Sequence, residues 1–213
     1  MLASGSMISV IVPVKDEPPE ALEALAELAA KPDAELIVAA GARGPRGACL
    51  ARAAARARGN ILFFVHADSR PPERALEIIR SAISGGAAAG AFSLGYDWPV
   101  RRMRWIAWWA NARTRLLGMP FGDQGIFCRR DAYEEAGGFR DLPVCDDLDL
   151  VRRLRRTGGF VVRPERTTTS ATRYRQRGAL RQVLRVWLVG AGYFLGVPAH
   201  RLARFYFRSE RVG

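Results

Sequence analysis

The sequence predicts an α/β protein with a mainly parallel sheet. Short apolar runs of strand type, at residues 8–14, 35–39 and 61–65, alternate with two segments of helical character, 19–30 and 48–58. Strands and helices that alternate at this spacing form βαβ units, whose strands lie parallel in one sheet. The 213 residues suffice for one well-buried domain, and no internal repeat or low-complexity linker divides them.

The first strand and the first helix are separated by a polar stretch. That stretch consists of Lys15, Asp16 and Glu17. The helix is expected from about Pro19, because proline suits a first helical turn and leucines then repeat on one side. Between the strand at 35–39 and the next helix lies a tight, basic loop rich in Gly and Pro, residues 41–47.

The apolar run at 61–65 is expected to be a strand covered on both faces. It is short, rich in β-branched and aromatic residues, and preceded by a Gly–Asn turn signal. The run stops on His66, Ala67 and Asp68. A carboxylate at the carboxyl end of a central parallel strand lies where open α/β sheets hold their ligands. The alternative is that Asp68 only caps the loop and the helix that begins near residue 72.

A helix at 72–84, a small apolar strand at 87–94 and a helix at 100–117 are predicted next. In the last of these, three tryptophans fall on one face and arginines lie beside it. Two interpretations stay open. The tryptophans pack on the sheet, or the helix is an interfacial or acceptor-binding element, since Trp combined with Arg is the composition that lies among lipid headgroups.

The second half of the chain carries two acidic motifs. A loop at 121–125 holds an Asp and a Gln and leads into a strand, followed by a short helix at 131–136. Residues 144–150, with three aspartates in the first turn, then open a helix that runs to about Thr157, where the helix dipole alone would explain the aspartates as caps. A Thr/Arg-rich strand or loop follows. Two amphipathic helices are predicted to end the chain, at 176–195 and 198–207.

The formal net charge of +12 points to an anionic partner. Arginine carries almost all of it, and guanidinium forks suit phosphate and carboxylate oxygens. A nucleotide diphosphate, a nucleic acid or a membrane surface would each satisfy this charge. Three cysteines without metal spacing indicate reduced thiols, as in a cytosolic protein. Residues 1–6 are expected to be a tag remnant before a natural start at Met7, and the longest uncharged apolar stretch, 186–199, is too short to span a bilayer.

Four motifs in order along the chain carry a resemblance to a known family. They are Val-Ile-Val-Pro-Val-Lys-Asp-Glu at 10–17, His-Ala-Asp at 66–68, Gly-Asp-Gln at 122–124 and Asp-Asp at 146–147. Together they resemble a family 2 glycosyltransferase of GT-A fold, from Met7 to about Phe207. The phrases His-Ala-Asp-Ser, Gly-Asp-Gln-Gly-Ile-Phe-Cys-Arg-Arg and Tyr-Phe-Leu-Gly resemble, more narrowly, a bacterial subgroup. That subgroup lies beside radical-SAM genes and is labelled arsenosugar-biosynthesis glycosyltransferase.

The resemblance implies an inverting transfer of a sugar from a nucleotide-diphosphate donor to an acceptor hydroxyl, with Mg²⁺ or Mn²⁺. It implies a GT-A domain at residues 7–172, with the amphipathic helices of 173–213 packed on the same domain. Asp68 matches the metal-binding position of the family's Asp-x-Asp element, and His66 stands where many members have the first Asp. One protein carboxylate is enough for Mg²⁺ when phosphates and water complete the shell.

Asp147 matches the second residue of the family's Glu–Asp pair, with Asp146 in place of the Glu. The resemblance therefore implies that Asp146 and Asp147 are catalytic, with Asp147 as the base that takes the proton of the acceptor hydroxyl. Gly122, Asp123 and Gln124 match the loop expected near the acceptor and the donor sugar. Further substrate-binding residues are expected at Pro13, Lys15, Asp16, Glu17, Arg43, Arg46, His66 and Ala67.

One departure from the family concerns the nucleobase. The family's second strand ends in an Asp that grips the base, and Ala40 occupies that position here. Asp16 or Glu17 would have to substitute for it, while Arg43 and Arg46 reach the diphosphate through the short loop. Either donor specificity is altered, or the chain is a degenerate member that binds nucleotide without efficient turnover.

Two other functions share some of these features. A nucleotidyltransferase uses the same metal chemistry, but the sequence lacks a Gly-rich N-terminal phosphate loop. A nucleic-acid-binding module would explain the charge, but no nucleic-acid motif is present, and we expect no nucleic-acid partner. The expected localisation is cytoplasmic. Peripheral contact of the Trp/Arg and C-terminal helices with an anionic membrane is left open beside ordinary core packing.

Overall fold

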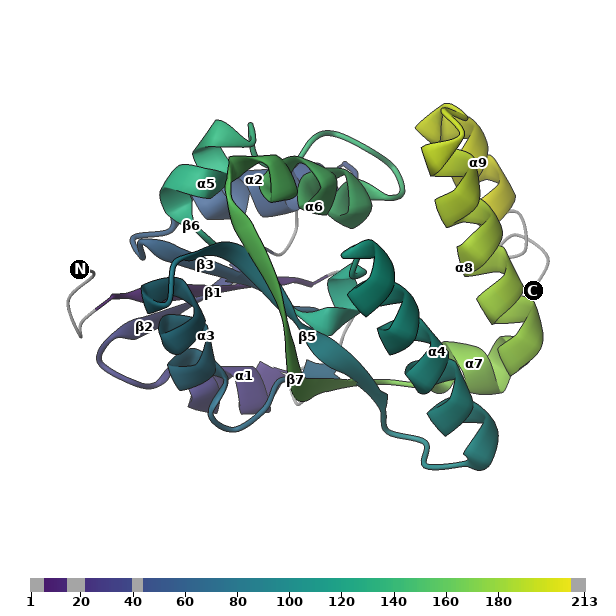
Figure 1. The fold of residues 1–213 in the computed structure, drawn as a ribbon, viewed down its shortest axis with the longest axis horizontal. Helices are drawn as coiled ribbons and strands as arrows, with labels where there is room; N and C mark the ends of the chain where they lie inside the picture. The colour runs from purple at the N-terminus through teal and green to yellow at the C-terminus, as the bar shows by residue number, and fades with distance from the viewer. Residues whose placement is uncertain (1–5, 15–21, 40–43, 208–213) are drawn as a thin grey trace.

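The computed structural model describes residues 6–14, 22–39 and 44–207 (Figure 1). Some predicted substrate-binding residues lie outside this described part of the chain: Lys15, Asp16, Glu17 and Arg43. Ala40, which stands where the base-binding Asp was expected, lies outside it as well.

One mixed sheet of seven strands forms the centre, in the order β2-β1-β3-β6-β5-β7-β4. The strands are β1 (Ile8–Pro13), β2 (Ala34–Ala39), β3 (Ile61–Phe64), β4 (Ser69–Arg70), β5 (Ala87–Tyr96), β6 (Ile126–Arg129) and β7 (Gly159–Thr169). β1 pairs in parallel with β2 and β3, and β5 pairs in parallel with β7. β6 lies antiparallel between β3 and β5, and β4 lies antiparallel to β7. The predicted mixed α/β class is confirmed.

Helices cover both faces of this sheet, and a separate group stands at one end (Figure 1). They are α1 (Glu23–Ala29), α2 (Arg46–Arg56), α3 (Ala75–Ser84), α4 (Arg101–Leu117), η2 (Gly122–Gln124), α5 (Arg130–Glu135), α6 (Asp146–Thr157), α7 (Thr172–Arg177), α8 (Ala179–Phe194) and α9 (Ala199–Phe207). In Figure 1, α2, α5 and α6 lie above the sheet and α1 and α3 below it. The described part of the chain contains no helix with the length and apolar character needed to cross a bilayer.

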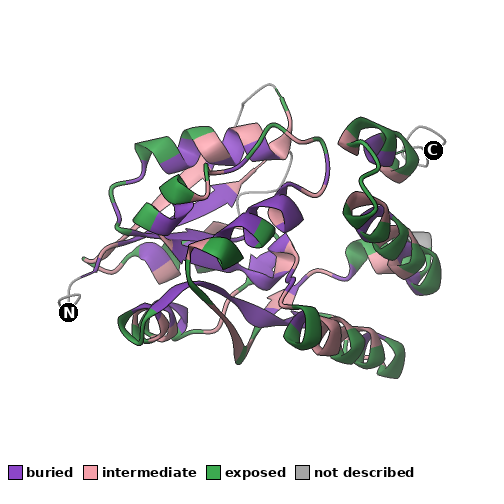
Figure 2. Ribbon diagram, turned by 45° about the horizontal axis from the view of Figure 1, so that its top comes forward, coloured by how far each residue is buried: buried purple, intermediate pink, exposed green. Residues whose placement is uncertain are grey.

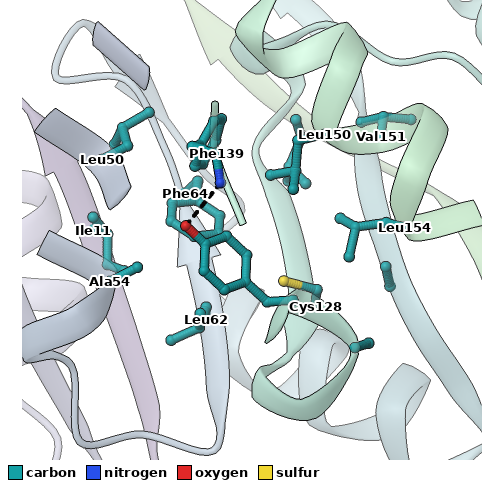
Figure 3. Close-up of a cluster of buried hydrophobic side chains, with 14 of the residues drawn as sticks. Ile11, Leu50, Ala54, Leu62, Phe64, Cys128, Phe139, Leu150, Val151 and Leu154 are labelled. Carbon is teal, nitrogen blue, oxygen red and sulfur yellow. Dashed lines mark hydrogen bonds between the residues drawn. The ribbon is translucent and has the colours of Figure 1, made fainter. Parts of the chain in front are cut away.

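The continuous apolar run of β3 is explained by this double cover. Leu62 and Phe64 join the cluster beneath α2, α5 and α6, while Ile61 and Phe63 join the one against α1 and α3. Because successive side chains of a strand point to opposite faces, both sets must be apolar. Figure 3 shows the first cluster, in which the rings of Phe64 and Phe139 meet edge to face at 4.9 Å. The backbone N–H of Phe139 donates to the Tyr133 hydroxyl at 3.1 Å.

The structure refines two predicted elements and adds a strand. Most of the helix predicted at 176–195 is α8, while residues 176 and 177 belong to α7, because Gly178, at φ +78°, separates the two helices. The Thr/Arg-rich segment, for which the sequence left strand and loop open, is the eleven-residue strand β7, which pairs along β5. The two-residue strand β4 was not predicted, since two residues show no periodicity.

The tryptophans of α4 do not pack on the sheet, so that interpretation is wrong. Trp105 is 63% exposed, Trp108 60% and Trp109 40%. The residues of α4 that are buried are Met103 and Thr114, on the side of the helix away from the tryptophans. Figure 2 shows how much of this helix is exposed. Its apolar face is therefore turned outward.

Candidate functional site

The chain brings four separate segments together beyond the carboxyl end of β3. Residues 66–68 follow β3 directly, and the start of the antiparallel strand β6 pairs with the end of β3, at Phe64 and Ile126. This pairing places η2, which precedes β6, beside residues 66–68. The first turns of α2 and α6 complete the site, as their contacts show.

Arg46, the first residue of α2, holds the acidic start of α6. Its Nε donates to Asp146 Oδ2 at 3.0 Å and its second amino group to Oδ1 at 2.7 Å, a bidentate pair. The same amino group lies 3.5 Å from Asp147 Oδ2. The Asp146 side chain is only 4% exposed. Burial raises the pKa of Asp146, and Arg46 opposes this by stabilising the carboxylate.

Arg46 also sets the state of His66. Its remaining amino group lies 2.8 Å from His66 Nε2. A guanidinium can only donate, so Nε2 must accept and the imidazole is neutral, with its proton on Nδ1. Burial and the positive charge of Arg46 lower the pKa of His66 to about 3. His66 therefore carries no charge at neutral pH.

Asp147 is fixed by two backbone amides. Its Oδ2 accepts from Gly122 N at 2.7 Å, and its Oδ1 accepts from Leu148 N at 2.8 Å. A Cβ on Gly122 would lie 2.9 Å from His66 Nε2 and 3.0 Å from Asp147 Oδ2, so the approach requires glycine. Cys145, at φ 60°, is the one non-glycine residue with positive φ in the described chain, and this unusual backbone opens α6.

Asp149, two residues on, has a different environment. Arg153 donates to its Oδ2 through two groups, at 2.9 and 2.7 Å, and the Tyr193 hydroxyl donates to Oδ1 at 2.8 Å. Only 2% of Asp149 is exposed. It therefore links α6 to α8.

Asp123, in the middle of η2, is a further carboxylate of the site. Its Oδ1 is buried and has no hydrogen-bond partner among the described residues. Burial and the negative charges of Asp147 and Asp68 raise its pKa to about 6, and Arg113 opposes the shift. Arg113 lies over the Phe121 ring at 3.9 Å, and its buried Nε also has no partner in the described chain. Unpaired buried polar groups are rare, and each calls for an explanation such as strain, a bound water, an ion or a ligand.

Gln124 is oriented away from this group. Its Oε1 accepts from Thr114 Oγ1 at 3.0 Å and from Phe121 N at 3.1 Å, and its Nε2 donates to the Phe92 carbonyl at 3.0 Å. The residue is fully buried. Its observed contacts join η2 to α4 and β5, and Gln124 itself does not line the cleft described below.

The site opens into a cleft of about 870 Å³, a size typical of small-molecule sites. Its acidic lining comes from Asp68, Asp123, Asp146 and Asp147, and Pro13, Arg46, His66 and Ala67 also line it. Asp68 is exposed, and its carbonyl accepts from Ser170 N at 3.2 Å. Gly122 lines an adjoining small pocket rather than the main cleft.

Residues that the sequence did not indicate also line the cleft. Tyr96 and Tyr174 face each other, hydroxyl to hydroxyl, at 2.9 Å. Gln182 of α8 is 3% exposed, and its Oε1 has no partner in the described chain. The helical period of α4 puts Arg113 on a different side of the helix from the exposed arginines, and this signal could have indicated it as a cleft residue. No local sequence signal indicates that Tyr174 or Gln182 reaches the cleft.

Comparison of the whole chain with solved structures identifies its fold. The mannosyltransferase PcManGT from Pyrobaculum calidifontis, in complex with GDP-Man and Mn²⁺, is similar with a TM-score of 0.62 over 93% of this chain and 69% of that one. The chain has the GT-A fold. Sequence identity to this mannosyltransferase is 16%. The likeness therefore concerns the fold.

TarS from S. aureus is similar as well. Its 1–349 structure matches with a TM-score of 0.59 and 14% identity, over 84% of this chain and 64% of that one. A longer TarS structure matches with a TM-score of 0.58 and 13% identity, again over 84% of this chain but 38% of that one. The chain thus spans less than two thirds of the length of TarS 1–349. No protein-family model matches the sequence, and no curated protein matches it significantly.

Proposed function

We propose that this chain transfers a sugar from a nucleotide-diphosphate donor to an acceptor hydroxyl, with inversion at the anomeric carbon. The observation that carries the proposal is the meeting of Asp68, Asp123 and Asp147 in one cleft of a GT-A fold. A neighbour of this fold binds GDP-Man and Mn²⁺, which supports a nucleotide sugar as the donor.

The residues present fit a divalent cation. Within the described residues no cluster of three or more His, Cys, Asp or Glu side chains has the geometry of a complete metal site. The fit is instead that of a single carboxylate, Asp68, supplemented by donor phosphates and water. The negative charges of Asp147 and Asp68 contribute to the raised pKa of Asp123. The electrostatic field at this place therefore favours an added positive charge. When bound, Mg²⁺ or Mn²⁺ would offset the negative charge of the departing diphosphate.

Asp147 is the base in this proposal. Its two oxygens are oriented by backbone amides rather than neutralised by a bidentate cation, and the side chain is 14% exposed at the cleft. The proton of the acceptor hydroxyl passes to Asp147 while the acceptor oxygen bonds to the anomeric carbon and the bond from that carbon to the diphosphate breaks. Asp123 is the second candidate, because a pKa of about 6 suits a proton acceptor near neutral pH.

Asp146, Arg46 and Gln124 are positioning residues in this proposal. Asp146 is buried at the edge of the cleft and both of its oxygens accept from Arg46, which favours a positioning role over that of the base. Arg46 donates to Asp146 and lies against His66, and it also lines the cleft, so its contact with the diphosphate stays a prediction from the sequence. Gln124 fastens the η2 loop. The narrower subgroup with an arsenosugar substrate stays a prediction from the motifs.

The first test separates binding from turnover. Thermal shift with UDP, GDP and their sugars, with and without Mn²⁺, should show a Mn²⁺-dependent rise in melting temperature, since a ligand of the folded state stabilises it. Asp68→Ala should abolish the Mn²⁺-dependent part. Equal shifts for the parent and Asp68→Ala would contradict the metal assignment. A rise in melting temperature without sugar transfer or hydrolysis would favour the degenerate, non-catalytic alternative.

A further inference from the structure

The described chain exposes its large apolar side chains in one region. All of them lie in α4 or in residues 180–207, which form α8 and α9 with their connection. In α8 the exposed leucines recur every four residues, which places them on one side of the helix. We name the α4–α8 face by six of these residues: Trp105, Trp108, Leu116, Leu180, Leu184 and Leu188. Contiguous exposed apolar surface marks an interaction site.

Stacked indole rings join the two helices into one surface. The ring centroids of Trp108 and Trp109 lie 5.8 Å apart, and those of Trp109 and Trp187 lie 6.0 Å apart. The stack thus runs from α4 across to α8. Tryptophan, with an apolar body and one N–H donor, is enriched where apolar and aqueous phases meet.

The distribution of arginines indicates which kind of partner binds this face. Helices α4, α7, α8 and α9 contain twelve arginines and no Asp or Glu. The whole chain has 33 Lys and Arg against 21 Asp and Glu, so the remaining residues balance and these helices account for the entire excess of +12. On α4, Arg101 and Arg104 are exposed and border the tryptophan face, one turn before Trp105 and Trp108 respectively. The partner must therefore accept apolar side chains and bear negative charge at the same surface.

An anionic lipid bilayer meets both requirements. A second copy of this chain would bring two arginine-rich faces together, and like charges at an interface are unfavourable. A nucleic acid would satisfy the arginines but would leave the leucine stripe of α8 uncovered. Trp and Leu at the headgroup boundary, with Arg on the lipid phosphates, is the composition of an interfacial helix.

The face is continuous with the catalytic cleft. Trp105 and Trp109 of α4 and Trp187 of α8 line the same cleft as Asp68 and Asp123. The buried Oε1 of Gln182, without a partner in the described residues, also lines it. The cleft thus has a carboxylate-rich inner end and an aromatic wall between the two exposed helices.

We propose that the α4–α8 face docks on an anionic bilayer and that the acceptor is an amphiphile held in that bilayer. Its hydroxyl-bearing head enters the carboxylate end of the cleft while its apolar part remains against the tryptophan wall. The docking stands on the surface alone, whereas the acceptor class rests on the proposed sugar transfer.

Vesicle sedimentation tests the docking. The full chain should bind vesicles of phosphatidylglycerol and phosphatidylcholine at low salt and pure phosphatidylcholine at least about tenfold more weakly. Trp108→Gln/Leu184→Gln/Leu188→Gln, which alters no residue lining the cleft, should weaken binding to the mixed vesicles at least about tenfold. Glutamine keeps the helix propensity high, and circular dichroism checks that each variant folds.

A charge-matched pair of variants makes the test specific. Arg104→Glu/Arg181→Glu and the control Arg56→Glu/Arg156→Glu change the net charge equally, and all four arginines are exposed. Arg104→Glu/Arg181→Glu should weaken binding to the phosphatidylglycerol vesicles at least about tenfold relative to the parent. The control pair should bind these vesicles at least about threefold more tightly than Arg104→Glu/Arg181→Glu does. Equal losses in both pairs, no binding by the parent at low salt, or self-association abolished by the Gln variant would each overturn the docking.

The acceptor class is tested with labelled nucleotide sugars, including GDP-mannose and UDP-glucose, and vesicles of total bacterial lipid. Label should pass into the organic phase, and the triple Gln variant should reduce that label at least about tenfold while the melting-temperature shift with nucleotide is unchanged. Label transferred only to water-soluble products would overturn the amphiphilic acceptor. Absence of both nucleotide binding and transfer, with vesicle binding intact, would instead refute the proposed function and leave the docking in place.

Discussion

Helices α6 and α4 are both rich in arginine and both amphipathic, yet the fold uses their apolar residues in opposite ways. In α6, Leu148, Val151 and Leu154 are at most 1% exposed and belong to the main core cluster. In α4, Trp105 and Trp108 are more than half exposed. A helical period therefore shows that an apolar face exists, while what covers that face depends on the rest of the fold.

The charged residues of the two helices also differ, because acidic partners are present within α6 and absent from α4. Arg153 of α6 is paired with Asp149, one turn earlier on the same helix. The arginines of α4 have no acidic residue within their own helix. Asp149 thus offsets part of the arginine charge of α6 within that helix, whereas nothing within α4 offsets the charge of its five arginines.

The largest expected effect comes from the acidic turn that only α6 possesses. Asp147→Asn should reduce kcat about 10²- to 10⁴-fold, because Asn cannot accept a proton. Stability should fall by about 1 kcal/mol or less, since an Asn oxygen can still accept from Gly122 N. Transfer assays and urea unfolding measure the two quantities. Near-parent turnover in Asp147→Asn together with an inactive Asp123→Asn would move the base to Asp123.

The next effect tests the covered and uncovered apolar faces directly. Leu154→Ala in α6 should lower the free energy of unfolding by about 2–5 kcal/mol, because a fully buried leucine leaves a cavity. Leu116→Ala in α4 removes the same atoms from a residue that is 84% exposed and should change it by less than about 0.5 kcal/mol. Urea denaturation measures both. Equal losses would mean that the α4 face is covered in solution.

A smaller effect is expected where η2 approaches α6. Gly122→Ala should lower stability by about 1–3 kcal/mol, since its Cβ would crowd His66 Nε2 and Asp147 Oδ2. Gly159→Ala is the matched control, because its Cβ would meet its neighbours only at 3.8 Å or more. Turnover should fall only in the first variant. Equal turnover in both variants would mean that the contact between Gly122 and Asp147 is unimportant for catalysis, and would contradict this prediction.

The smallest effect concerns the pH dependence of stability. Asp123 has a pKa raised to about 6 in the folded chain, so the folded state holds its proton more tightly than the unfolded one. Its unfavourable effect is absent below about pH 4 and develops as pH rises through about 6. Asp123→Asn should therefore gain stability relative to the parent, by about 1–2 kcal/mol, between pH 4 and pH 7. Metal-free unfolding at both pH values measures this; a constant difference would contradict it.

The outcome for particular residues shows how far sequence reasoning reached. The motif residues of β3, η2 and α6 were expected near one another, and Asp68, Asp123, Asp146 and Asp147 do line one cleft. Gln124 and Arg46 were predicted to bind substrate; the contacts that the structure shows for them are to protein groups, and their substrate contacts stay predictions. A residue's type and place in a motif indicate that it belongs to a site, whereas its hydrogen-bond partners come from distant segments.

The sequence by itself determined the elements whose signal is local: the buried strands, the apolar stripe of α6 and the excess of arginine without acid in the terminal helices. Only the tertiary structure decided which apolar face is covered, which aspartate Arg46 pairs with, and that Gln182 and Tyr174 reach the cleft. The physical reason is range. Periodicity and propensity act between neighbours along the chain, while burial and ion pairing arise from contacts such as Arg46 with Asp146, one hundred residues apart.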